Sequence, residues 1–188
     1  MIPVLAVLAA AAAGGFRLAM PLLFVLILRR EDGWEQLPVL GQFSPAVTLG
    51  VLTGWTLWEL LASAHPWGVR WLQPLQVLLS PLVGWILGVM TAQVVGIPTG
   101  LRNLMGLMGS ALALLLQLVQ VGWLYRWGRF PAWLVLIQDG LCGLLVVFAL
   151  RAPQSGGLIA LMLLWLALRM SKDWQRQFQR HRRAQLPD

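Results

Sequence analysis

Residues 3–28 read PVLAVLAAAAAGGFRLAMPLLFVLIL, an apolar run that contains a single charged side chain, Arg17. The run exceeds the roughly 20 apolar residues that a helix needs to cross a bilayer. A guanidinium keeps its proton in hydrocarbon, so it must meet a carboxylate, backbone carbonyls, a lipid phosphate or water. The stretch therefore predicts a membrane helix with a buried charge. Gly14-Gly15 beside that charge makes a broken or re-entrant helix the alternative.

Five more apolar segments follow the first. They lie near Pro45–Ala64, Leu72–Val95, Leu101–Leu124, Pro131–Leu150 and Gly157–Leu168. Helices are expected throughout, because a strand edge in lipid would leave backbone groups unpaired. We therefore expect an all-α integral membrane protein with a single transmembrane domain over residues 1–168 and a basic tail over residues 169–188.

Composition agrees with this class of protein. The 188 residues are 59% hydrophobic and only 11% charged, too little polar surface for a water-soluble globule of this size. The net charge is +7, and basic residues concentrate in the tail. That placement favours anionic lipid headgroups over nucleic acid as the partner. In the tail, apolar and basic residues each recur every four positions, which predicts an amphipathic helix on the cytoplasmic leaflet. Its headgroup-binding candidates are Lys172, Trp174, Arg176, Arg180 and Arg183.

The distribution of Lys and Arg also predicts orientation. Six full spans would place both termini in the cytoplasm, on the side that carries most basic residues. The fourth segment begins Pro98-Thr99-Gly100, so it too could be broken or re-entrant, and four spans plus two hairpins would leave both termini cytoplasmic as well. We expect a multi-pass protein of the bacterial inner membrane or of an internal membrane.

Two short stretches in the first half of the chain resemble stretches in the second half, which suggests an internal repeat. Gly15-Phe16-Arg17-Leu18 resembles Gly100-Leu101-Arg102-Asn103, and Phe43-Ser44-Pro45-Ala46 resembles Phe130-Pro131-Ala132 at nearly the same offset. Two halves of three segments each would insert with opposite orientation, as in many secondary transporters. The alternative is chance similarity between apolar sequences punctuated by Gly and Pro.

Four charged side chains inside apolar segments are the candidate functional residues: Arg17, Glu59, Arg102 and Asp139. We expect Arg17 to be buried and paired with Asp139 or Glu59, since an unpaired guanidinium at depth is costly. As a functional group, such a pair would belong to a substrate-anion or proton-coupled site. The alternative is a structural ion pair that locks helices together.

Two pairs of glycines are spaced for close helix contact: Gly50 with Gly54, and Gly84 with Gly88. Small residues four apart let helix backbones approach closely. We expect packing within the chain, with homodimerisation through one pair as the alternative.

The sequence lacks the common motifs of catalytic and phosphate-binding sites. There is no Gly-rich phosphate loop and no Gly-x-Ser-x-Gly motif, and Gly109-Ser110 has no His or Lys in an apolar segment to activate the serine. The histidines His65 and His181 lie outside the apolar segments, so no metal or haem site is expected. We expect no enzymatic activity and no cofactor.

Several short motifs resemble those of a bacterial family of small membrane proteins, the domain of unknown function 4126. They are the stretch from Gly15 to Leu22, Leu57-Trp58-Glu59-Leu60-Leu61-Ala62 followed by His65-Pro66-Trp67, and Gln138-Asp139. The resemblance implies an integral membrane protein with no established activity. It also implies an Asp-Lys pair and a Glu-Asp pair where this chain has Ser63-Ala64 and Gln138-Asp139.

Two functions are compatible with these features. The first is a small transporter, flippase or permeation-type protein that uses the four charges around a midplane cavity. The second is a non-catalytic accessory or assembly subunit of a larger membrane complex, in which the charges are structural.

Overall fold

The first apolar segment folds as two helices separated at Arg17. The computed structural model describes residues 2–28, 40–64, 66–127 and 132–184, and in it α1 covers Ile2–Phe16 and α2 covers Ala19–Leu28. The sequence explains the break, because Gly14-Gly15 weakens the helix by about 1 kcal/mol per glycine. Pro21 cannot donate to the carbonyl of Arg17 and its ring would clash there. The break that was one alternative for this segment is confirmed.

Most of the remaining described residues are helical. The helices are α3 (Pro45–Ala64), α4 (Pro66–Val94), α5 (Thr99–Trp127), α6 (Ala132–Arg151) and α7 (Pro153–Ala184), with a short 3-10 turn, η2, over Leu40–Gln42. Proline stands at the first position of α3, α4 and α7, where its missing N–H costs nothing. Gly96 adopts a positive φ of 78° after α4 and closes the turn into α5. The described residues contain no β-strand, so the predicted all-α class is confirmed.

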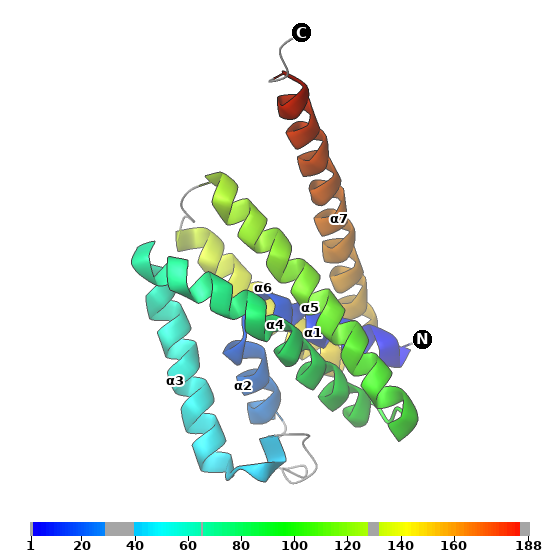
Figure 1. Cartoon of the computed structure of the whole chain (residues 1–188). Helices are drawn as coiled ribbons and strands as arrows, with labels where there is room; N and C mark the ends of the chain where they lie inside the picture. Colours follow the sequence, from blue (N-terminus) through cyan, green and yellow to red (C-terminus); the bar gives the residue numbers. More distant parts are fainter. Residues whose placement is uncertain (1, 29–39, 65, 128–131, 185–188) are drawn as a thin grey trace.

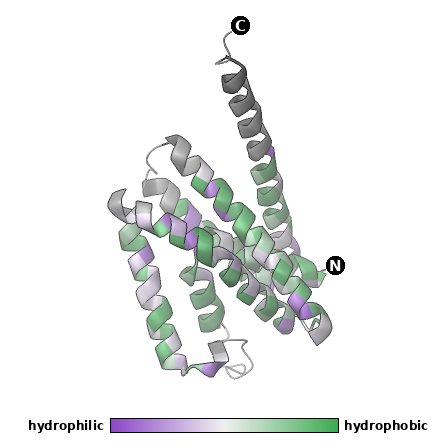
Figure 2. Ribbon diagram, in the orientation of Figure 1, coloured by the Kyte–Doolittle hydropathy of each residue, from purple (hydrophilic) through white to green (hydrophobic). Residues whose placement is uncertain are grey.

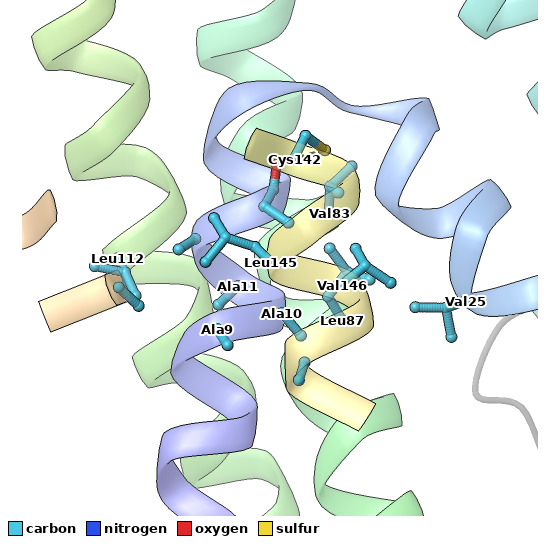
Figure 3. Packing of buried hydrophobic residues seen from close by; sticks show 14 of the residues in the cluster. Ala9, Ala10, Ala11, Val25, Val83, Leu87, Leu112, Cys142, Leu145 and Val146 are labelled. Atoms are coloured by element: carbon cyan, nitrogen blue, oxygen red, sulfur yellow. Dashed lines mark hydrogen bonds between the residues drawn. The ribbon is translucent and has the colours of Figure 1, made fainter. Parts of the chain in front are cut away.

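Helix α1 is the centre of the molecule, packed against α4, α5, α6 and α7 (Figure 1). Its alanines from Ala9 to Ala13 are all buried, and their small side chains let the surrounding helices approach closely. Figure 3 shows Ala9, Ala10 and Ala11 beside Leu145 and Val146 of α6. The run of alanines therefore lies within the core of the domain.

The chain reverses direction at the break. In Figure 3 the chain turns over at the end of α1, and α2 runs back the opposite way past Val25. The 15 residues of α1 and the 10 residues of α2 correspond to about 22 Å and about 15 Å, both short of the roughly 30 Å hydrocarbon core. The first segment thus has the geometry of a re-entrant hairpin.

Among the described residues, three helices are long and apolar enough to cross a membrane, in the windows Pro45–Ser63, Trp71–Val94 and Thr99–Gly122. Large apolar side chains cover their outer faces, among them Leu61, Leu78 and Leu107, each more than half exposed. Figure 2 shows apolar residues along most of α3 and α5 and along the first half of α7. Such surfaces are typical of contact with lipid, so the molecule is an all-α membrane protein.

The fourth segment differs from the first. Helix α5 runs without interruption from Thr99 to Trp127, so the break considered at Pro98-Thr99-Gly100 is absent, because these residues only begin the helix. The resemblance between Gly15-Phe16-Arg17-Leu18 and Gly100-Leu101-Arg102-Asn103 therefore does not extend to local structure. Helix α7 also continues without interruption past Leu168 to Ala184, and the lipid contacts of the tail stay a prediction.

The two glycine pairs behave differently. An added Cβ at Gly84 would lie 2.6 Å from the carbonyl oxygen of Gly109, and one at Gly88 would lie 2.8 Å from that of Met105. Packing of Gly84 and Gly88 within the chain is thus confirmed, at the contact between α4 and α5. At Gly50 and Gly54 an added Cβ would meet nothing within 4 Å, so the expectation of packing within the chain is wrong for this pair.

Candidate functional site

A buried ion pair joins the break in the first segment to α6. Arg17 is 5% exposed, and its Nε donates to Oδ1 of Asp139 at 2.6 Å, while Nη2 lies 3.4 Å from Oδ2. The two contacts form the forked geometry in which a guanidinium and a carboxylate bind most specifically. Arg17 also follows the carboxyl end of α1, where the helix dipole favours a positive charge. The predicted burial and acidic pairing of Arg17 are confirmed, with Asp139 as the partner.

Helix α3 reaches the same guanidinium through a serine. Nη1 of Arg17 donates to Oγ of Ser63 at 2.9 Å, and this hydroxyl donates to the backbone carbonyl of Glu59 one turn earlier. Arg17 is therefore connected to two helices, to α6 by charge and to α3 by a neutral hydroxyl.

Glu59 is the most deeply buried charged side chain among the described residues, at 1% exposed. Its Oε1 accepts one long hydrogen bond, 3.3 Å, from the indole Nε1 of Trp55, and its Oε2 has no hydrogen-bond partner. Arg17, the Gln76 side chain and the backbone of Leu18 lie close enough to influence the carboxyl group electrostatically. Glu59 thus belongs to the same cluster as Arg17 and Asp139.

Glutamine amides satisfy the carbonyls that the break sets free. A helix end leaves its last carbonyls without partners inside the helix. Here Nε2 of Gln120 donates to the carbonyl of Gly15 at 3.0 Å, and Nε2 of Gln138 donates to that of Phe16 at 3.0 Å. The two glutamines also contact each other, at 2.6 Å. Side chains of α5 and α6 therefore hold the end of α1 in place.

The cluster lies between the middle of the bundle and one of its ends. Asp139 is seven residues into α6 and Gln120 is seven residues before the end of α5, about 10 Å along each helix. Glu59 and Ser63 are in the last two turns of α3. The turn between α1 and α2, with Arg17, thus lies toward this end of the bundle and away from the midplane expected for the site.

Arg102 does not belong to the cluster, contrary to the grouping of four charges expected from the sequence. Its Nε donates to the carbonyl of Ile97 at 2.9 Å, so it caps the turn between α4 and α5. On α5 it precedes Gln117 by 15 positions, about 22 Å at 1.5 Å per residue. A charge at the start of an apolar segment can reach a local carbonyl, which is why its position in the sequence was misleading.

The uncharged polar side chains of the cluster were not among the site residues predicted from the sequence. Gln76 and Gln117 are buried and contact each other across α4 and α5, and Gln120, Gln138 and Ser63 contact the break. The available signal was a set of glutamines inside otherwise apolar segments, where an amide needs a partner as a charge does.

Comparison with known proteins identifies a family without assigning an activity. Neither the curated proteins nor the solved structures gave a match to this chain. One family model matches residues 4–173, which include the whole cluster and all helices except the first two residues of α1 and the last part of α7. The chain therefore belongs to the family described as the domain of unknown function DUF4126.

Proposed function

We propose that this protein is a small transporter or permeation-type membrane protein whose solute or coupling ion binds at the break between α1 and α2. The observation that carries the proposal is a re-entrant pair of half-helices whose tip holds a buried ion pair and a second buried carboxyl group. Broken helices that meet charged groups inside the membrane are a recurring design of solute sites in secondary transporters. Ionisable side chains at such depth are costly in contact with lipid, so they generally face the protein interior or a water-filled cavity and mark solute or ion pathways.

The position of the cluster supports this role. Only about 10 Å of α6 separates Asp139 from the nearer end of the bundle, so the barrier on that side is thin. Ser63, Gln120 and Gln138 are only partly buried, and each contacts either Arg17 or one of the two carbonyls that precede it. A solute with an anionic group would meet the guanidinium of Arg17, which has five N–H groups and makes three contacts with the described side chains.

Transport by purified protein in vesicles is the direct test. A panel of small anions, cations and zwitterions is presented to the vesicles, and charge or solute movement is recorded. We expect at least one solute to give a signal with the wild type that the double variant Arg17→Met/Asp139→Leu loses while remaining folded. Arg151→Met is the matched control, because Arg151 is an exposed arginine at the end of α6, and it should transport normally.

An accessory subunit is the second candidate, and one observation favours it. The window of α3 that could cross a membrane has only 11% of its residues buried, and a Cβ added at Gly50 or Gly54 would meet none of the described residues within 4 Å. A larger protein that covered α3 would account for both. Mass analysis of the native complex in mild detergent decides between the two functions. A stoichiometric larger partner, together with no solute signal from the folded protein, would reject transport.

A further inference from the structure

We propose that Glu59 carries an exchangeable proton, and that its ionised form competes with Asp139 for the guanidinium of Arg17. This inference rests on the proposed transport function, in which the proton would be the coupling ion. It concerns a carboxyl group that the Arg17–Asp139 ion pair does not use.

Charge balance is the first argument. The cluster holds one guanidinium and two carboxyl groups, so it would carry a net negative charge if both were ionised. The groups that face Glu59 offer no further cation: α2 and the described side chains of α4 contain no ionisable residue, α3 contains no other, and α6 contributes Asp139 and the thiol of Cys142. Arg102 caps a distant turn. An isolated buried charge is costly, and such a group generally becomes neutral instead.

Hydrogen bonding is the second argument. An ionised carboxylate offers about four acceptor positions. Glu59 receives one long bond from Trp55, and its Oε2 receives none, although the Gln76 side chain and the Leu18 backbone lie near it. Asp139, in contrast, accepts two guanidinium N–H groups. The surroundings of Asp139 therefore suit an anion, and those of Glu59 suit the neutral acid.

Ser63 makes an exchange of partners feasible. Nη1 of Arg17 already points to α3, where it donates to Ser63, one turn after Glu59 on the same helix. A rotation of the guanidinium from Asp139 toward Glu59 would supply the counter-charge that Glu59 lacks. The proton would then leave Glu59 for water at the nearer end of the bundle, and Asp139 would become the group able to accept a proton or a solute cation.

Infrared spectroscopy of the protein in vesicles tests this directly, because a protonated carboxyl group absorbs apart from the amide bands. We expect a protonated-carboxyl band in acidic buffer that is lost in alkaline buffer. Glu59→Gln should remove the band, Glu59→Asp should shift its frequency, and Asp173→Asn, in the polar part of α7, should leave it unchanged. A band that is unaffected by both Glu59 variants, or no such band at any pH, would overturn the proposal.

A second variant, Asp139→Asn, tests whether Glu59 and Asp139 compete for Arg17. Asp139→Asn frees the guanidinium, so Glu59 should take it and ionise, and the band should be lost at a pH where the wild type retains it. Retention of the band in folded Asp139→Asn would refute the exchange. The same vesicles are used to measure solute movement. A band at Glu59 without any transport would reject the proposed function alone, and transport without the band would reject only this inference.

Discussion

At the residue scale, the cluster shows how a charge can be accommodated deep in a membrane helix. Arg17 is stabilised by three independent sources: a carboxylate on α6, a hydroxyl on α3 and the carboxyl end of α1. Glu59 has no comparable support. Two carboxyl groups share one guanidinium, and only Asp139 is paired with it. This is the feature most relevant to function, because the second carboxyl group can then gain or lose a proton or bind a cation.

Removing one partner of the ion pair should lower the free energy of unfolding far more than removing both partners. Arg17→Met leaves Asp139 buried without its counter-charge, and we expect a loss of about 3 to 5 kcal/mol in the free energy of unfolding. Arg17→Met/Asp139→Leu removes both charges and should be nearly as stable as the wild type. Equilibrium unfolding in mixed micelles measures both variants. Equal destabilisation of the single and double variants would show that the pair contributes net stability.

The Gln120 amide, which caps the end of α1, should also contribute measurably to the free energy of unfolding. Gln120→Leu removes the donor to the Gly15 carbonyl and leaves that oxygen buried, at an expected cost of about 1 to 3 kcal/mol. Gln154→Leu is the control, since Gln154 is exposed near the start of α7, and it should leave stability unchanged. A Gln120 variant as stable as its control would mean that water or lipid replaces the cap.

At the element scale, helix approach depends on local contacts that spacing alone cannot reveal. The sequence contains two glycine pairs with the same spacing, but only the pair on α4 faces another backbone. Likewise, Gly-x-Arg occurs in the first and fourth segments, yet only the first contains a proline four residues after its arginine. The break follows from Pro21 together with the two glycines, and α5 lacks this combination.

The glycine pairs therefore give a matched test. Gly84→Ala puts a methyl group against the backbone of Gly109 and should destabilise the protein by about 1 to 3 kcal/mol through overpacking. Gly54→Ala meets open space and should leave stability unchanged or raise it by up to about 1 kcal/mol, because alanine favours helix. Thermal unfolding in detergent measures both. A destabilised Gly54 variant would indicate that another chain packs on α3.

At the scale of the whole molecule, hydropathy predicted the helical class and the burial of Arg17, because both depend on composition along one segment. It could not choose between Asp139 and Glu59, since both carboxyl groups lie in the cluster around Arg17 and the choice depends on how α3 and α6 pack around the end of α1. It also could not place Gln120 and Gln138, whose partners are carbonyls released by the break after α1. Contacts between distant segments decide these points, and periodicity within a segment carries no information about them.

The reversal after α1 has a consequence for orientation that differs from the one expected from charge alone. The start of α1 packs at the turn between α4 and α5, where Val7 joins Ala92 and Ile97. From α3 to α7 successive helices alternate in direction, so α7 ends at the other end of the bundle (Figure 1). With the basic tail in the cytoplasm, the N-terminus would then lie on the opposite side of the membrane.

Cysteine labelling in intact cells tests this topology. The chain has one cysteine, Cys142, which is buried, so Cys142→Ala provides a cysteine-free background in one substitution. A membrane-impermeant maleimide should label Ile2→Cys from outside and should reach Arg183→Cys only after the membrane is opened. The reason is geometric: a first segment that turns back contributes no crossing, and five alternating helices place the two ends apart. Protection of both positions would mean that the first segment crosses the membrane after all and that both termini are cytoplasmic.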